Sequence, residues 1–168
     1  MINSGEDSVA ARKREDNAGL ETLMALLTAD AQRIAFPTNI MERVTAPTGE
    51  LTGLKFRLRN TFYCAQPVSC ISEISASIGG AQFAADHIHF ILRDQVISAK
   101  YAPTFHELWW GFGEVLDILI DLGGSAGRNL PIIGRLNLEL FLRMRTSISY
   151  GLPGDAYCLH LRNEMEVR

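Results

Sequence analysis

The sequence predicts an all-β fold, an antiparallel β-sandwich resembling a jelly roll, with a short N-terminal helix ahead of it. Three observations lead to this prediction. Several segments after Pro47 alternate apolar and polar residues, as strands with one buried and one wet face do. Glycine and proline separate these segments. No regular helix lies between them, which makes a βαβ architecture a poor fit.

The chain is expected to divide into an N-terminal extension, residues 1–36, and a β-sandwich domain, residues 37–168. Its first residues are polar and mixed in charge, which is typical of a tail. Asn17 suits a helix N-cap, and the leucines and the methionine that follow recur at helical spacing. Pro37 closes the region, because the residue before a proline avoids the helical basin. One short amphipathic helix is therefore predicted here.

The first half of the β domain contains four predicted strands. In the first, three apolar side chains alternate with three cations, which places them on opposite faces. Gly79 and Gly80 supply the positive φ that a tight hairpin turn requires. The four predicted strands are residues 54–59, 74–78, 81–83 and 87–92.

The second half shows the clearest alternation, which begins after Gly113 and ends at Gly123. A flexible connection with Gly127 and Pro131 follows, and then a long segment in which leucine recurs at every second position. The strands predicted here are residues 115–122, 136–145, 148–150 and 157–161. Seven or eight short strands with this punctuation favour a sandwich.

Composition excludes several functions. The formal net charge is −3, from 16 basic and 19 acidic residues, so no broad cationic field favours nucleic acid or an anionic membrane. The three cysteines have neither metal-ligand spacing nor a disulfide framework, which indicates a reducing compartment. No apolar stretch has the length of a membrane span or the form of a secretory signal. We therefore expect a cytoplasmic protein.

Residues of the types found in catalytic and metal sites are present, but they do not complete a recognisable site. His87 and His89 are predicted to share one face of a strand, a spacing used by metals, but no carboxylate at a recognisable spacing joins them. Glu107 and Glu114 flank aromatic residues that raise carboxylate pKa values, yet one structural and one solvated carboxylate is the favoured interpretation. The segment 123–128 resembles a phosphate loop but lacks its Lys-Ser or Lys-Thr.

The most informative cluster is Trp109-Trp110-Gly111-Phe112-Gly113. Three large aromatic residues with two glycines are unusual in a chain that is 8% aromatic. Aromatic surfaces form interfaces and stack on sugars and planar ligands. The other interpretation is that these rings close one end of the sandwich core, and the sequence leaves both open.

The order of several segments resembles the β subunit of the C-glycoside deglycosidases, enzymes built from two kinds of chain, from about Ile40 to the C-terminus. The specificity lies in the shared order, since no single motif decides it. Two features depart from the family pattern: the N-terminal extension, and the absence of the expected Arg-Gly at residues 64–66. The matching segments are residues 53–59, Phe62-Tyr63, residues 67–71, the hairpin 74–83, residues 110–114, and residues 147–150 before Pro153.

The resemblance implies a heteromeric lyase that cleaves the C–C bond between a 3-keto sugar and an aromatic aglycone. It implies that a TIM-barrel-like α subunit supplies the base and a divalent metal, expected to be manganese, while this chain is a non-catalytic β subunit without a cofactor. A higher hetero-oligomer is also expected. The candidates for the contact between the two chains or for the rim of the aglycone pocket are Phe62, Tyr63, Trp109, Trp110 and Phe112.

Two rival functions stay open at this stage. The first is a stand-alone carbohydrate-binding sandwich that uses the same tryptophans as an exposed stacking platform. The second is a small metal-dependent enzyme of jelly-roll type that uses His87 and His89.

Overall fold

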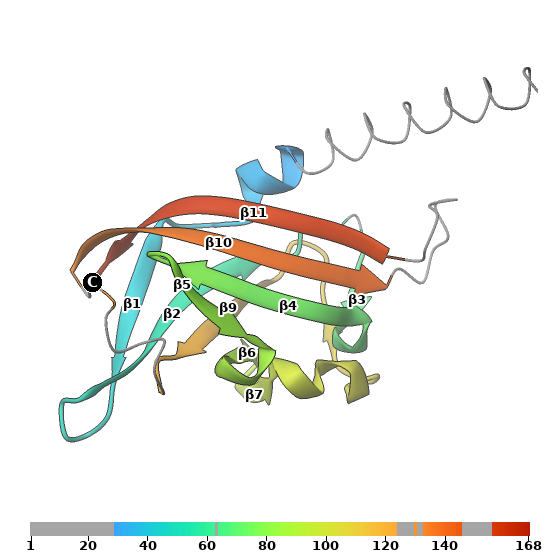
Figure 1. Cartoon of the computed structure of the whole chain (residues 1–168). Coiled ribbons are helices and arrows are strands. Elements are labelled where there is room, and N and C mark those ends of the chain that lie inside the picture. The colour runs from blue at the N-terminus through green and yellow to red at the C-terminus, as the bar shows by residue number, and fades with distance from the viewer. Residues whose placement is uncertain (1–28, 63, 124–129, 131–132, 146–155) are drawn as a thin grey trace, which may run out of the picture.

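The computed structural model describes residues 29–62, 64–123, 130, 133–145 and 156–168 (Figure 1). Eleven strands and three 3-10 helices are assigned within them. The strands of the large sheet are β1 (Ile40–Thr45), β2 (Leu51–Arg59), β4 (Ile71–Ile78), β5 (Ala81–Ala84), β6 (Ile88–Leu92), β7 (Gln95–Ser98), β9 (Val115–Asp121), β10 (Gly134–Arg145) and β11 (Ala156–Val167). The short elements are β3 (Gln66–Pro67), β8 (Trp109–Trp110), η1 (Val68–Cys70), η2 (Ala85–His87) and η3 (Ala99–Thr104).

The large sheet has the order β5-β4-β10-β11-β1-β2-β9-β6-β7, and β3 pairs with β8 in a separate two-stranded sheet. Strand β1 joins the two halves of the large sheet: it pairs in parallel with β11 at Ile40 and Met41 and then antiparallel with β2. Every other pair in the described sheets is antiparallel. The all-β, sandwich-like fold is thus confirmed, with a single curled sheet providing its layers (Figure 1).

The core lies between the inward faces of this sheet. The alternating leucines of β10 are all buried, and so are the alternating apolar residues of β2, β4 and β9. They belong to one cluster of buried side chains. The hairpin glycines also behave as predicted, with φ of 54° at Gly79 and 88° at Gly80 between β4 and β5. Alternation therefore identified the strands that build the core.

Several predicted boundaries need correction. His87 lies in η2, so it does not share a strand face with His89 on β6. Strand β11 continues to Val167, beyond the predicted end at residue 161, because β10 pairs with it along its whole length. Strands β1 and β7 were not predicted. The predicted helix after Asn17, the connection with Gly127 and Pro131, and the predicted strand 148–150 lie outside the described residues.

The last part of the N-terminal region packs on the sheet. Residues 29–34 are helical, and Ala31 and Ala35 belong to the buried core. The Arg59 amide donates to the Ala35 carbonyl at 2.7 Å, and the Arg162 amide donates to the Gln32 side-chain oxygen at 2.6 Å. The helical turn consequently lies beside β11 (Figure 1). The division of the chain at residues 36 and 37 stays a prediction.

None of the helices in the described part of the chain has the length and apolar character needed to cross a membrane.

Candidate interaction surface

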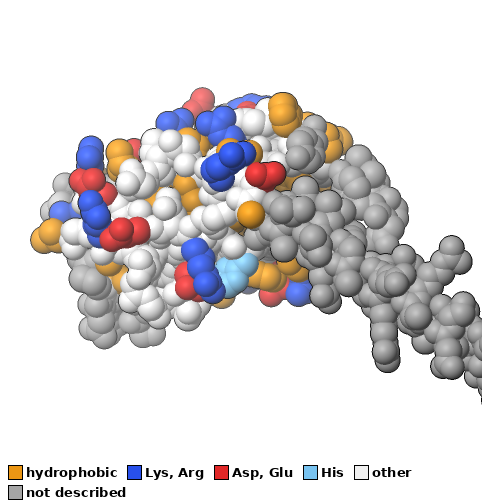
Figure 2. Space-filling view, turned by 90° about the horizontal axis from the view of Figure 1, so that it is seen from above, with side chains coloured by type: hydrophobic (Ala, Val, Ile, Leu, Met, Phe, Trp, Pro, Cys, Tyr) orange, Lys and Arg blue, Asp and Glu red, His pale blue; other side chains and the backbone are white. Residues whose placement is uncertain are grey.

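Exposed apolar side chains gather in one stretch of the described chain. Seven large hydrophobic residues of the described chain are exposed, and five of them lie in the segment from β7 to the loop after β8. By contrast, the face seen in Figure 2 intersperses basic and acidic side chains, with apolar ones scattered among them. The five clustered residues are Val96, Tyr101, Phe105, Trp109 and Phe112.

The aromatic loop, which we define as residues 109–113, divides its three rings between the core and the surface. Trp110 is 2% exposed, whereas Trp109 is 49% and Phe112 69% exposed. The two tryptophans differ because β8 pairs with β3, and successive residues of a strand point in opposite directions. The core interpretation therefore holds for Trp110, whereas Trp109 and Phe112 face outward, and their role at an interface stays a prediction.

A tight turn carries Phe112. The Glu114 amide donates to the Gly111 carbonyl at 3.1 Å, which closes a four-residue turn with Phe112 at its first corner. Gly113 occupies the second corner with φ of 67°, a value that the third position of a type II turn requires and that favours glycine. The backbone consequently presents the phenylalanine ring at the tip.

Asn60, directly after β2, anchors the aromatic loop from beneath. It is 2% exposed, and its side-chain amide donates to the carbonyls of Trp110 and Gly111, both at 2.9 Å. The same nitrogen lies 3.2 Å from the carbonyl of Cys64, and its side-chain oxygen accepts from the Phe62 amide at 2.8 Å. The side chain thereby satisfies several backbone groups that the loops on both sides leave without strand partners.

Glu114 anchors the same loop from its far end. Its carboxylate accepts two hydrogen bonds from Arg93, both 2.8 Å, and one from the Gly111 amide at 2.6 Å. Its backbone carbonyl accepts from the Trp110 indole at 2.9 Å. The hydrogen bond from Arg93 is the largest of the causes that lower the pKa of Glu114 below its usual range. Of the two glutamates that the sequence offered as one structural and one solvated carboxylate, Glu114 thus has the contacts of a structural one.

The ion pair makes the stability of the fold pH-dependent in a defined window. Because the pKa of Glu114 is lowered on folding, the carboxylate's contribution to the stability of the fold is fully present above the ordinary carboxyl pKa of 4.5. This contribution is lost as pH falls through the pKa of Glu114 in the folded state. We expect Glu114→Gln to be less stable than the wild type at pH 7, with the difference shrinking below pH 4.5. Urea denaturation of both proteins across this range measures it. A difference that stays constant down to the acid limit would contradict the assignment.

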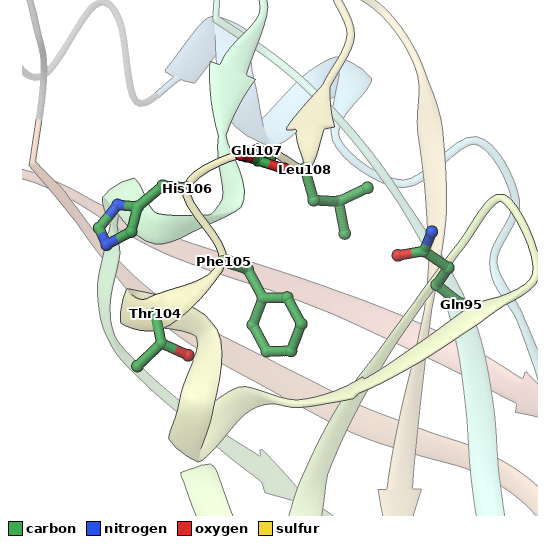
Figure 3. A pocket seen from close by; sticks show the side chains of 6 residues that line it. All are labelled: Gln95, Thr104, Phe105, His106, Glu107 and Leu108. Atoms are coloured by element: carbon green, nitrogen blue, oxygen red, sulfur yellow. The ribbon is translucent and has the colours of Figure 1, made fainter.

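A pocket of about 570 Å³ adjoins the aromatic loop (Figure 3). Phe105 and Leu108 point into it from the segment before β8, and Gln95 of β7 faces them across the opening. The His106 ring points away from this space. The remaining lining residues are Thr104 and Glu107. The lining therefore combines two apolar side chains with four polar or ionisable ones.

The other predicted site residues are not exposed aromatic residues of this loop. Phe62 is partly buried and packs against the core, and Tyr63 is outside the described residues. His87 is half-buried with its ring centroid 6.4 Å from that of Phe83, and its Nδ1 lacks a hydrogen-bond partner. Among the residues that the structure describes, no group of three or more His, Cys, Asp or Glu side chains is placed to hold a metal ion.

Two residues of the site have no signal in the sequence. Asn60 and Arg93 are lone polar residues beside strands, and their partners lie 50 or 51 and 21 positions further along the chain. Only the pairing of β2 with β9, and of β9 with β6, brings them to the aromatic loop.

These features define an all-β, sandwich-like domain with an outward-facing aromatic loop that hydrogen bonds anchor at its base. The chain belongs to the C-glycoside deglycosidase beta subunit family, whose family model matches residues 33–128. The match includes the aromatic loop together with Asn60, Arg93 and Glu114. No curated protein matches the chain.

Proposed function

We propose that the chain is the non-catalytic β subunit of a heteromeric, lyase-type C-glycoside deglycosidase in the cytoplasm. The observation that carries the proposal is the family match over residues 33–128. In the proposed reaction, the complex cleaves the C–C bond between a 3-keto sugar and an aromatic aglycone. The ketone acidifies the neighbouring C–H bond, so that a base starts the elimination. A TIM-barrel-like α subunit would supply this base and a divalent metal, such as manganese.

The proposed contact with the α subunit, or with the rim of its aglycone pocket, centres on Trp109 and Phe112. Exposed aromatic residues at rigid positions are frequent binding hot spots, because they bury large apolar areas at a low entropic cost. Trp110 would support this contact from the core, where it is 2% exposed. Phe62 belongs to the same proposed region, since its amide shares Asn60 with the loop. Tyr63 is proposed for the contact from its place in the sequence alone.

A stand-alone carbohydrate-binding domain is the second candidate. The half-exposed ring of Trp109 favours it, because a tryptophan face is a suitable platform for a sugar. Isothermal titration of the isolated chain with simple glycosides separates the two functions. Millimolar or tighter binding would favour the carbohydrate-binding domain.

Reconstitution tests the subunit assignment. We expect the chain alone to leave a 3-keto C-glycoside intact, and a complex with the α subunit encoded beside it to release the aglycone. Trp109→Ala and Phe112→Ala should each reduce co-purification of the α subunit by about tenfold or more, because they truncate the proposed hot spots. Product release is followed chromatographically.

Ile133→Ala is the matched control, because this residue is 83% exposed and lies outside the aromatic loop. It should co-purify the α subunit to the same extent as the wild type. Cleavage by the purified chain alone would overturn the non-catalytic assignment.

A further inference from the structure

We propose that the aromatic loop is a preformed knob that inserts into an apolar socket on the catalytic subunit, and that Arg93, Glu114 and Asn60 are its positioning residues. The inference rests on the proposed function, and it adds which side chains set the geometry of the contact. Three observations carry it: the hydrogen bonds that converge on the loop, the two glycines within it, and the backbone conformation of Arg93.

The loop is held from three separate parts of the chain. Asn60 reaches it from the end of β2 and donates to two of its carbonyls, both at 2.9 Å. Arg93 reaches it from the turn between β6 and β7 through the carboxylate of Glu114. Strand β3 pairs with Trp109 and Trp110. A surface loop needs far fewer restraints than this merely to connect two strands.

The glycines explain why these restraints matter. A Cβ atom at Gly111 would lie 2.9 Å from Oε2 of Glu114, so a side chain there would displace the carboxylate from the Gly111 amide. Gly113 has φ of 67°, where other residues are strained. Gly113 therefore requires glycine, and a side chain at Gly111 would be accommodated only by moving the Glu114 carboxylate. Glycine is the most flexible residue in a free loop. The hydrogen bonds from Asn60 and Glu114 remove that flexibility before a partner binds.

Arg93 occupies a backbone position that disfavours it. Its φ is 50°, and the following Asp94 has φ of 66°, in a two-residue hairpin turn where glycine and asparagine are preferred. Its side chain is 57% exposed, so it contributes little to the core. The strained backbone is offset by the paired hydrogen bonds to Glu114, which in turn hold the Gly111 amide. An arginine thus occupies a position where the turn alone would favour glycine.

These features define the kind of partner surface. Phe112 is 69% exposed at the tip of the turn, so it fits a concave apolar socket rather than a flat face. The positive charge of Arg93 is matched by Glu114 at the base of the loop, so the socket needs no charged rim to receive it. Preordering of such a knob strengthens binding, because the cost of immobilising the loop is met during folding.

A double-mutant cycle with Arg93→Gly and Phe112→Ala tests the proposal. Affinity for the catalytic subunit is measured by surface plasmon resonance, and the melting temperature of the β subunit alone is measured in parallel. Arg93→Gly should weaken binding by about tenfold, since the loop must then be ordered on binding. The melting temperature should change by only a few degrees, because relief of the positive φ opposes the loss of the ion pair with Glu114. A purely structural role would lower the melting temperature and leave the affinity of the folded protein unchanged.

The cycle also shows through which residue Arg93 acts. In the Phe112→Ala background, Arg93→Gly should have a smaller effect on affinity, because the exposed ring at the tip of the loop is already absent. Asp94→Gly is the matched control: it relieves the same turn without touching Glu114 and should bind within about twofold of the wild type. Wild-type affinity for Arg93→Gly, or an equal loss in both backgrounds, would overturn the positioning role. A wild-type chain that fails to bind would instead refute the proposed function.

Discussion

Replacing Trp110 with alanine should lower the free energy of unfolding by about 3–5 kcal/mol, the range for removing a large aromatic residue from a core. Trp110 is 2% exposed and belongs to the cluster of buried side chains that forms the core. Its indole also donates to the Glu114 carbonyl at 2.9 Å, and that acceptor would lose this donor. Urea denaturation followed by circular dichroism measures the change.

Trp109→Ala provides a control of unusual closeness, because it removes the same side chain from the adjacent residue of β8. Trp109 is 49% exposed, so we expect a loss of about 1 kcal/mol or less. The effects on partner binding should have the opposite order once each variant is compared in its folded form. Equal destabilisation by the two substitutions would contradict the division of the rings between core and surface.

The parts of the fold that sequence predicts are those whose core faces follow a strict period of two. The alternation along β10 and β9 gave nearly correct strands because each has one face wholly buried. Strand β1 escaped prediction because its burial does not alternate: Glu42 and Arg43 are consecutive and both exposed. Strand β7 was not predicted because the turn before it has Arg93 and Asp94 at positive φ and lacks the glycine that usually indicates a hairpin.

The site could be predicted only where residues adjacent in sequence define it. Trp109, Trp110 and Phe112 were visible as a cluster, but sequence alone did not divide them between core and surface. That division depends on the pairing of β8 with β3, in which Trp110 lies opposite Gln66. Arg93 and Asn60 were missed for the same physical reason, since their roles arise from contacts between distant strands. Such contacts leave no local period to detect.

Asn60→Asp should destabilise the fold by about 3–5 kcal/mol, although the substitution barely changes the size of the side chain. The amide nitrogen of Asn60 donates to two carbonyls at 2.9 Å and lies 3.2 Å from a third. Its orientation is fixed, because the Phe62 amide donates to the side-chain oxygen. An aspartate would place an acceptor with negative charge opposite three acceptors, at a site that is 2% exposed.

The pH dependence of this variant separates electrostatic from steric effects. Burial and the facing carbonyls raise the pKa of the introduced carboxyl, so its cost is complete at neutral pH and falls as the group becomes protonated and can donate again. The stability difference from the wild type should therefore narrow on acidification. Asn137→Asp, at an exposed position on β10, is the control and should change stability by about 0.5 kcal/mol or less.

The same variant connects the stability of the fold to the proposed contact. Without the Asn60 donor, the carbonyls of Trp110 and Gly111 lose the hydrogen bonds that fix the base of the aromatic loop. Asn60→Asp should therefore bind the proposed catalytic subunit more weakly than Asn137→Asp, even at temperatures where both chains remain folded. Normal stability and normal binding would together mean that water satisfies these carbonyls, and that the loop does not depend on Asn60 for its conformation.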